Sequence, residues 1–512
     1  MACGRASVEL ALSWEQKQQF TAPHVVVCAF PAQGHIIPAL SFSELLASKG
    51  FFVTYVCAEH RLADLRKRIH AAGDKCKIRL AALPDKLPLG QYGIDEGPES
   101  LSWSMENVSK MKGDFQQLMG DLMTSSKLTS PTCVISDFFL SWTQDVANQF
   151  KIPRYVFFSC PAACLCILMY LPVLIEQGQI PVRTLGNQTN QSCYQTRAII
   201  VPGLPPLSPP DMLYSLKDSC PKDIQEFVIK NSLRIHESAA IFINTYHELE
   251  KNAVDALRGE KINPNKIKIH LVGPLLPSDF FREDNLESKR ALAYSEEERR
   301  CLEWLDKRPK SSVLYVSFGS IAILSVAQIR EFALGLEASG QLFLWVLRPP
   351  SSHSDISAIS SLLPQGFQSR ISNHGLILYK WAPQLLILSH PSVGGFLTHC
   401  GWNSTLESIC RGIPMLAFPQ FAEQHLICKI LVEQLKVGLQ IRKEASGMAE
   451  RGEIERRVKI LMDSDKGRLL RKTAREARER ASQNAATTNT SSQSFMQLFL
   501  QCHMNLRRCY SS

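Results

Sequence analysis

The sequence predicts an α/β fold with two doubly wound parallel sheets, and three observations lead to that prediction. The chain has 512 residues, which is enough for two large domains. Short, continuously apolar runs recur along both halves, as is typical of strands buried on both faces of a parallel sheet. Segments of helical length separate these runs, and this alternation indicates parallel strands joined by helices.

The first half of the chain holds six predicted strands. They are HVVVCAF (24–30), FFVTYVCA (51–58), KIRLAALP (77–84), TCVISDFF (132–139), RYVFFS (154–159) and AAIFINTY (239–246). The segment 183–222 interrupts the alternation, because its proline-rich VPGLPPLSPPD is typical of an irregular loop.

The second half repeats the pattern with seven predicted strands. They are KIHLVGPL (268–275), SVLYVSFGS (312–320), LFLWVLRP (342–349), GLILYKWAP (375–383), VGGFLTHCG (393–401), IPMLAFP (413–419) and VGLQIR (437–442). The polar segment 278–300 is expected to be a surface loop before a helix at 301–309, and a short amphipathic helix is expected at 493–506. Because doubly wound sheets bind ligands at the carboxyl ends of their strands, we look for functional residues there.

Composition and charge narrow the class of protein. Hydrophobic residues make up 45% of the chain and charged residues 21%, so the chain can bury a substantial core. The net charge is +9, but the densest basic run, 451–480, is interleaved with acids. Mixed signs are typical of a solvated helix face, so we expect no nucleic-acid partner.

Cysteine usage and hydropathy indicate a cytoplasmic protein. The sixteen cysteines form no CxxC pair, which argues against a zinc framework, and buried reduced thiols suit a reducing compartment.

The apolar run 155–175 is long enough to cross a membrane, but it contains Pro161 and Pro172. We interpret it as a buried strand that enters a buried helix. Glu9 interrupts the short apolar run near the N-terminus, so no targeting segment is expected.

The segment 381–424 concentrates the candidate ligand-binding residues. A strand ends at His399 and Gly401, and a helix is expected from an N-cap at Asn403 or Ser404 to a stop at Gly412. A strand, a turn of small residues and a helix start together present free backbone N–H groups, which favour an anion such as a phosphate. His399 can add a hydrogen bond to that anion.

The other polar and aromatic residues of this segment suit the rest of a nucleotide sugar. A phosphate would repel Glu407, so this carboxylate is better suited to accept the two hydroxyl hydrogens of a ribose. Trp381 offers a flat face to a base, and Glu423 with Gln424 suits a polyhydroxylated ring. Taken singly, Trp381 is equally a core aromatic, and Glu407 is more often a surface acid. The joint pattern favours one ligand made of base, ribose, diphosphate and sugar.

This segment resembles the signature of plant UDP-sugar-dependent glycosyltransferases that act on small molecules. The shared residues are W-A-P-Q from 381, H-C-G-W-N-S at 399–404, Glu407, G-I-P at 412–414 and E-Q at 423–424. Further landmarks are FPAQGHIIPAL (30–40), VISDFFLSWTQDVA (134–147), FINTYHELE (242–250), VGPLL (272–276), CLEWLDKRP (301–309) and LYVSFGS (314–320).

The resemblance implies the GT-B fold, in which two Rossmann-like domains face a cleft. Residues 1–265 would form the acceptor-binding domain and residues 266–490 the UDP-sugar-binding domain. The segment 491–512 would form a C-terminal helix and tail that pack back on the first domain.

The resemblance also implies a set of site residues. His35 matches the general base and Asp137 its partner acid, although without the signature segment a lone turn histidine and a helix N-cap are the favoured explanations. The positions that match contacts to the UDP-sugar are Ser320, Trp381, Ala382, Gln384, His399, Gly401, Trp402, Asn403, Ser404, Glu407, Glu423 and Gln424. Trp402 and Gln424 are usual in members that use UDP-glucose, whereas Phe418 replaces a tryptophan found in many members.

The implied function is inverting transfer of glucose from UDP-glucose to a hydroxyl of a small lipophilic or phenolic acceptor. The acceptor would be a secondary metabolite such as a flavonoid, phenol or terpenoid, and the product a β-O-glycoside. UDP-glucose is the co-substrate, and we expect no metal or other cofactor, no membrane span and a monomer. The alternatives are a catalytically silent UDP-sugar-binding protein and an epimerase-like or hydrolytic enzyme. A dinucleotide dehydrogenase is disfavoured, because no G-x-G-x-x-G follows an early strand.

Overall fold

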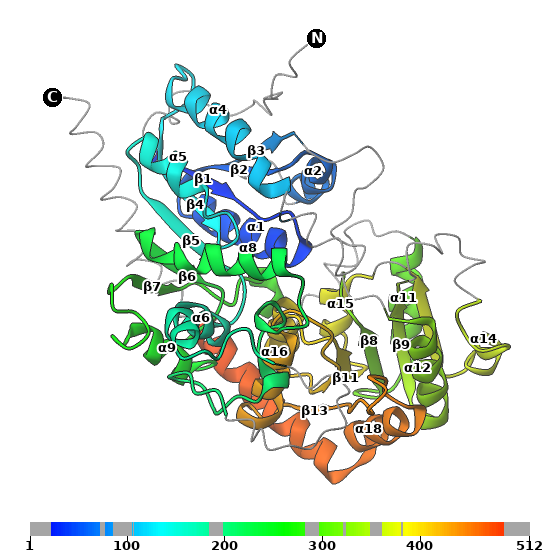
Figure 1. Ribbon diagram of the computed structural model, residues 1–512. Coiled ribbons are helices and arrows are strands. Elements are labelled where there is room, and N and C mark those ends of the chain that lie inside the picture. The colour runs from blue at the N-terminus through cyan, green and yellow to red at the C-terminus, as the bar shows by residue number, and fades with distance from the viewer. Residues whose placement is uncertain are drawn as a thin grey trace. The chain divides into compact units, whose positions relative to one another are not determined.

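The computed structural model divides the chain into two compact units, each built on a parallel sheet flanked by helices (Figure 1). The structure describes residues 22–71, 77–84, 105, 107–183, 198–281, 296–320, 324–348, 361–379 and 382–485. Among the described residues, the first unit runs to Leu275 and also includes Ala485, and the second runs from Leu276 to Asn484. The predicted fold class, with two parallel α/β sheets, is confirmed.

The sheet of the first unit has seven parallel strands in the order β3-β2-β1-β4-β5-β6-β7. They are β1 (His24–Cys28), β2 (Phe52–Ala58), β3 (Ile78–Leu83), β4 (Pro131–Asp137), β5 (Arg154–Phe158), β6 (Ala240–Ile243) and β7 (Lys268–Leu271). The chain first moves outward from β1 to β3 and then returns to β4 on the other side of β1. This reversal places a topological switch point at the carboxyl ends of β1 and β4, where such sheets bind ligands.

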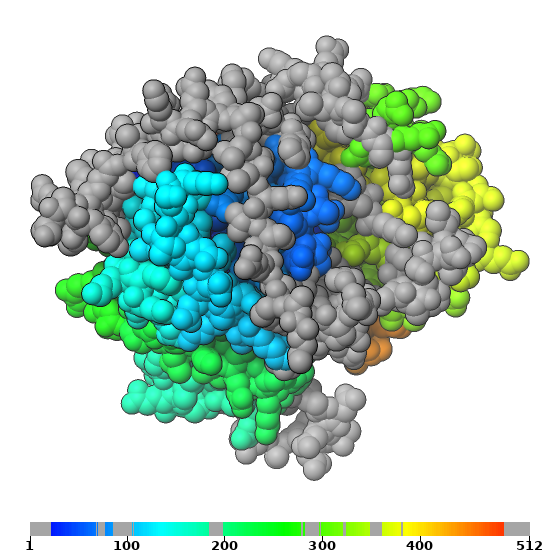
Figure 2. Space-filling view, turned by 90° about the horizontal axis from the view of Figure 1, so that it is seen from above, coloured from blue at the N-terminus to red at the C-terminus, as the bar shows by residue number. Residues whose placement is uncertain are grey.

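Helices cover this sheet. They are α1 (Gln33–Ser48), α2 (Leu62–Ala71), α4 (Lys112–Met123), α5 (Thr143–Gln149), α6 (Ala162–Met169), α7 (Leu171–Glu176), α8 (Lys222–Leu233) and α9 (Lys251–Arg258). Phe42 of α1 packs on the sheet, with its ring centroid 5.5 Å from Phe157 and 5.3 Å from Phe242. One side of α4 buries Phe115 and Leu118, and its other side reaches the surface seen in cyan in Figure 2.

The apolar run 155–175 is a strand followed by helices, as predicted. It forms β5, α6 and the first part of α7, with Pro161 as the N-cap of α6 and Pro172 in the first turn of α7. Proline is tolerated at these positions, because the first N–H groups of a helix have no intrahelical partner. Among the helices that the structure describes, none has the length and apolarity needed to cross a membrane.

The sheet of the second unit has six parallel strands in the order β10-β9-β8-β11-β12-β13. They are β8 (Val313–Ser317), β9 (Leu342–Leu347), β10 (Gly375–Tyr379), β11 (Val393–Thr398), β12 (Met415–Ala417) and β13 (Gly438–Gln440). The order again reverses beside the first strand, between β8 and β11. The carboxyl ends of these two strands therefore form the switch point of the second sheet.

Helices also flank the second sheet. They are α11 (Glu296–Asp306), α12 (Val326–Ser339), α14 (Phe367–Arg370), α15 (Gln384–Ser389), α16 (Trp402–Arg411), α17 (Gln424–Lys429), η7 (Ile430–Gln434) and α18 (Arg451–Asp463), followed by a helix over 465–485. Figure 1 shows α12 beside α18, and the two pack closely at Gly335. A Cβ atom on Gly335 would lie 2.7 Å from Ile454, so a larger residue would push the helices apart.

Two sequence predictions differ from the structure. The run 268–275 was expected to begin the second series of strands, but its strand β7 pairs with β6 at the edge of the first sheet. An apolar run does not reveal which sheet edge it will join, because that depends on long-range pairing. In addition, the predicted loop 278–300 gives way to helix already at Glu296, where α11 begins. The helix expected at 493–506 and the segment 491–512 lie outside the described residues.

Candidate functional site

His35 and Asp137 lie together at the switch point of the first sheet. His35 is in the first turn of α1, which begins soon after β1, and Asp137 is the last residue of β4. Because β1 and β4 are paired, their carboxyl ends are neighbours. The Nδ1 atom of His35 lies 2.7 Å from Oδ2 of Asp137. His35 is therefore not a lone turn histidine.

The carboxylate of Asp137 is held in a fixed orientation. Its side chain is 1% exposed, and its second oxygen, Oδ1, accepts a hydrogen bond of 3.0 Å from the backbone N–H of Phe139. The helix that follows, α5, begins only at Thr143, so Asp137 is not a helix N-cap. Since the Nδ1 atom of His35 faces this carboxylate, the ring proton belongs on Nδ1 and the lone pair on Nε2.

Aromatic rings and one hydroxyl complete the surroundings of His35. The ring centroids of Phe30 and Phe139 lie 5.3 and 5.5 Å from that of the imidazole, whose side chain stays 17% exposed. The Oγ atom of Ser159 lies 3.1 Å from Nδ1. Sequence reasoning missed Ser159. This residue directly follows β5, which pairs with β4, so it lies at the same carboxyl end of the strands as Asp137.

A buried cation lies beside Asp137 and was also missed. Arg154 donates from Nε to the hydroxyl of Ser136 at 2.8 Å and from Nη2 to the backbone oxygen of Asp137 at 3.5 Å. Burial lowers the pKa of this guanidinium to about 10, so it remains charged at neutral pH. A buried charge needs an opposite charge nearby, and the carboxylate of Asp137 supplies part of that compensation.

A second set of predicted residues lies at the start of α16, beyond the end of β11. The helix begins at Trp402 with Gly401 as its N-cap, so the predicted N-cap at Asn403 or Ser404 is wrong. Both residues lie instead in the first turn, because glycine at the N-cap lets the helix start earlier. Gly412 ends the helix in the left-handed conformation with φ of 68°, as predicted.

Two glycines make room for His399. A Cβ atom on either Gly319 or Gly401 would lie 2.5 Å from the imidazole, which is closer than side chains pack. Burial lowers the pKa of His399 to about 4, so the ring is neutral at physiological pH. Its Nδ1 atom is buried, and no described residue gives it a hydrogen bond. A buried polar atom of this kind at a helix start fits the predicted contact with a diphosphate.

Gln384, Ser404 and Glu407 form one hydrogen-bonded group. Gln384, the first residue of α15, donates from Nε2 to Oε2 of Glu407 at 2.6 Å and to the hydroxyl of Ser404 at 2.9 Å. Burial raises the pKa of Glu407 to about 7, and the hydrogen bond from Gln384 opposes that rise. The structure thus brings Gln384 of α15 against two residues that lie one turn apart on α16.

Glu423 and Gln424 follow the loop after β12, as the N-cap and the first residue of α17. β12 pairs in parallel with β11, so this loop begins at the carboxyl ends of the strands, as His399 does. Gln424 is 5% exposed, and its Oε1 accepts hydrogen bonds from the backbone N–H groups of Gln420 and Phe421 at 2.9 and 3.2 Å. These bonds fix the amide so that its Nε2 group is the side that remains to donate to a ligand.

The remaining predicted residues have simpler environments. Ala382 and Trp402 are buried, and Ser320 follows β8 and accepts a hydrogen bond from Arg348 at its backbone oxygen. Trp381, the predicted base-stacking residue, lies outside the described residues. Phe418, which replaces a tryptophan of the family, is fully buried, and the ammonium of Lys443 lies 4.8 Å from its ring centroid.

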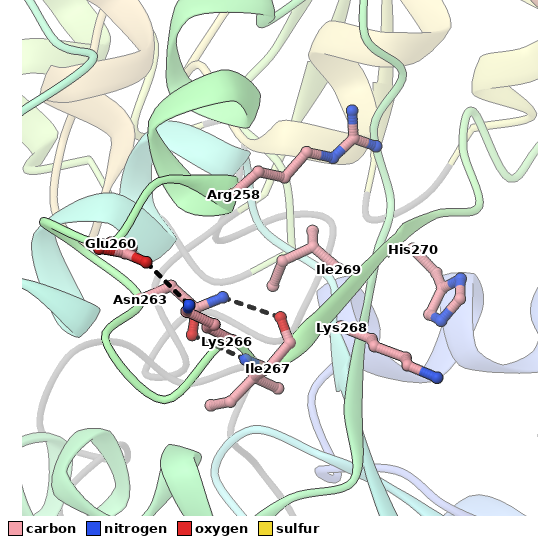
Figure 3. Close-up of a pocket in the computed structure, with 8 residues that line it drawn as sticks. All are labelled: Arg258, Glu260, Asn263, Lys266, Ile267, Lys268, Ile269 and His270. Atoms are coloured by element: carbon pink, nitrogen blue, oxygen red, sulfur yellow. Dashed lines mark hydrogen bonds and ion pairs between the residues drawn. The ribbon is translucent and has the colours of Figure 1, made fainter.

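A metal site and a cavity are the two other kinds of ligand site that a fold of this type can offer. Within the described ranges, no three histidine, cysteine or acidic side chains are grouped so that they could hold a metal ion. A cavity of about 400 Å³ lies at the open edge of the first sheet, between the end of α9 and β7 (Figure 3). Its charged residues include Arg258, Lys268 and a Lys266–Glu260 ion pair of 2.8 Å. It contains none of the predicted site residues.

Comparisons with known proteins extend over nearly the whole chain. The family model "UDP-glucoronosyl and UDP-glucosyl transferase" matches residues 40–466. The 7-deoxyloganetin glucosyltransferase of Gardenia jasminoides is 34% identical over 486 residues, which cover 93% of this chain and 97% of that protein.

Solved structures agree with this match. Phytolacca americana UGT2, complexed with UDP-2fluoro-glucose and pterostilbene, has a TM-score of 0.76 and 30% identity, covering 94% of this chain and 100% of that one. Medicago truncatula UGT71G1, complexed with UDP-glucose, has a TM-score of 0.75 and 27% identity, covering 95% and 99%. The chain therefore belongs to the family of UDP-glucuronosyl and UDP-glucosyl transferases, and it is a UDP-glycosyltransferase with the two parallel-sheet units of the GT-B fold.

Proposed function

We propose that this glycosyltransferase moves glucose from UDP-glucose to a hydroxyl of a small lipophilic or phenolic acceptor, with inversion at the anomeric carbon. The contact between His35 and Asp137 is the observation that carries the proposal. It suits a base held in position at the carboxyl ends of β1 and β4, where sheets of this kind bind ligands. We assign acceptor binding and proton removal to the first unit and donor binding to the second.

The proposed chemical step is a single displacement. The Nε2 atom of His35 takes the proton of the acceptor hydroxyl, and the acceptor oxygen forms a bond to the anomeric carbon. The bond from that carbon to the diphosphate breaks, and its electron pair leaves with UDP. An α-linked donor then becomes a β-glycoside. Asp137 keeps the imidazole in the required tautomer and stabilises the imidazolium that forms.

The donor residues are proposed to bind UDP-glucose in three parts. The N-terminal turn of α16, with His399 and Ser404, would receive the diphosphate and stabilise the charge that develops on it. Glu407 would accept the ribose hydroxyls. Gln424 would donate from Nε2 to a hydroxyl of the sugar, with Glu423 beside it as an acceptor. None of these steps needs a metal ion.

The comparisons support glucose and a small acceptor. One relative is named as a glucosyltransferase, and the two solved structures hold UDP-glucose or a fluorinated form of it. Pterostilbene is bound in one of them. We further propose that the protein acts as a monomer in the cytoplasm. The cysteines that the structure describes are all free thiols, and nearly all are buried, which suits a reducing compartment.

The proposal is tested with purified protein, UDP-glucose and a panel of phenols and terpenoids, read by mass spectrometry as gain of one hexose. We expect His35→Ala to lower turnover by about 10²–10⁴-fold, the usual contribution of a general base. His247→Ala is the matched control, since His247 also pairs with a carboxylate, Asp255 at 2.8 Å, but takes no part in the site. UDP binding without any hexose gain on any acceptor would favour the catalytically silent alternative.

A further inference from the structure

Tyr315 is a buried residue in the middle of β8 whose hydroxyl reaches the donor site. Its side chain is 1% exposed, and its ring stacks on Phe396 with centroids 4.9 Å apart and planes inclined by 22°. The hydroxyl donates a hydrogen bond of 3.1 Å to Oε1 of Gln384. Nothing in the sequence pattern singles out Tyr315, since it lies inside a strand rather than at its end.

The hydrogen bonds that lead from Tyr315 through Gln384 to Ser404 and Glu407 all run in one direction. A phenol has one hydrogen, so Tyr315 donates it to Gln384. Gln384 then donates through its amide hydrogens to Ser404 and Glu407. Donors aligned in this way polarise one another, and each bond strengthens the next.

This direction determines which end of the Gln384 amide faces the site. An amide can turn over, and its oxygen and nitrogen are nearly equal in size. The donor from Tyr315 holds the oxygen on the core side, so the NH₂ group faces Glu407. A reversed amide would place its oxygen against the carboxylate of Glu407. Both groups are acceptors, so no hydrogen bond could form between them.

The orientation of Gln384 also determines what Ser404 and Glu407 offer to a ligand. The hydroxyl oxygen of Ser404 already accepts from Gln384, so its own hydrogen is left to be donated, which suits a phosphate oxygen. The Oε2 atom of Glu407 is held by Gln384, so Oε1 is left as an acceptor, which suits a sugar hydroxyl. Both residues thereby acquire the polarity that a nucleoside diphosphate requires.

We propose that Tyr315 is a positioning residue of the donor site, which orients Gln384 so that Ser404 acts as a donor and Glu407 as an acceptor toward UDP. The inference rests on the proposed function, in that it takes UDP as the ligand of these residues. Tyr315 acts through Gln384 and does not touch the ligand itself.

The first test is the affinity for UDP, measured by calorimetry on the full chain. We expect Tyr315→Phe to bind UDP about fivefold to tenfold more weakly, which corresponds to the loss of one buried hydrogen bond. The KM for UDP-glucose should rise by a similar factor, while kcat at saturating donor stays within about twofold of wild type, because no reacting atom is touched. Tyr155→Phe is the control, since Tyr155 is equally buried in the first unit. Equal UDP affinity in Tyr315→Phe and wild type would overturn the proposal.

A double-mutant cycle separates positioning from general packing. If Tyr315 acts through Gln384, Tyr315→Phe has no further effect on UDP affinity once Gln384→Ala is present. The same fivefold to tenfold loss in both backgrounds would show that Tyr315 supports the site in another way, and would overturn the proposal. Should Tyr315→Phe not fold, Gln384→Glu decides, because it keeps an acceptor for Tyr315 but removes the amide hydrogens that donate to Ser404 and Glu407. We expect UDP binding to be at least about fivefold weaker there, and unchanged binding would contradict the inference.

Failure of the inference differs from failure of the proposed function. A wild-type protein without measurable UDP affinity would overturn both. A wild-type protein that binds UDP and transfers hexose, with a Tyr315→Phe variant that binds UDP equally well, would overturn only the role of Tyr315.

Discussion

His35 and Asp137 are 102 residues apart in the chain, yet Nδ1 of the histidine lies 2.7 Å from Oδ2 of the aspartate. The pairing of β1 with β4 brings them together at the point where the strand order of the first sheet reverses. Each residue by itself has an ordinary explanation, whereas together they have the geometry of a base and its orienting acid.

The first prediction concerns the role of Asp137. Asp137→Asn preserves the shape of the side chain but offers an amide to Nδ1, so the imidazole proton moves to Nε2 and the base is lost. We expect kcat to fall by about 10²–10⁴-fold, while the affinity for UDP is unchanged. Steady-state kinetics and calorimetry check this, with Asp255→Asn as the control, because Asp255 pairs with His247 at the surface. Comparable turnover in the two variants would argue against a catalytic His35–Asp137 pair.

The second prediction concerns the pH dependence of nucleotide binding. Burial raises the pKa of Glu407 to about 7, so this group is largely protonated at pH 6 and largely ionised at pH 8. Only the ionised form accepts hydrogen bonds with both oxygens, so UDP affinity should rise as the pH increases through about 7. Titration calorimetry between pH 6 and 8 measures this. Glu407→Gln should bind UDP more weakly, without the Glu407-dependent rise, and a wild-type slope retained in that variant would assign the titration to another group.

The third prediction concerns the space around His399. Gly401 has φ of −63°, so alanine there meets no backbone strain, but its Cβ atom would lie 2.5 Å from the imidazole. We expect Gly401→Ala to displace the ring and to weaken UDP binding by about tenfold, a loss of roughly one hydrogen bond. Gly452→Ala is the control in the same unit, because a Cβ atom there has nothing within 4 Å. Its UDP affinity should equal that of wild type.

The fourth prediction concerns stability in acid. His24 is fully buried between Thr129 and Thr54, and burial lowers its pKa from 6.5 to about 4. The unfolded chain therefore binds more protons than the folded chain between pH 4 and 6.5, so stability rises with pH across this window and is lost as the pH falls through it. The loss attributable to His24 is about 3 kcal/mol in the free energy of unfolding.

Urea unfolding at pH 7 and pH 5 tests this prediction. His24→Gln should unfold at lower urea than wild type at pH 7, but its midpoint should change less between the two pH values. His236→Gln, at an exposed position, is the control and should keep the wild-type pH dependence. An unaltered dependence in His24→Gln would show that the acid sensitivity arises elsewhere.

Much of the proposed donor site could be predicted because its residues are close in the chain. The run from His399 to Gly412 is one strand end, one turn and one helix, so its geometry follows from local rules on glycine and helix termini. Even so, the N-cap was placed two or three residues too late. The strands could be predicted equally well, since a continuous apolar run indicates a buried strand whichever neighbouring strand it pairs with.

The features that could not be predicted depend on which strands pair and on which side chains are buried together. The sequence by itself determined the alternation of strands and helices, the family and the candidate donor residues, because these are properties of contiguous segments. Only the tertiary structure decided that β7 joins the first sheet, that Ser159 lies beside His35 and Arg154 beside Asp137, and that Tyr315 holds Gln384. In each case the partners come from different strands or helices that are far apart in the chain, because neighbouring strands of a parallel sheet are joined by long crossover connections.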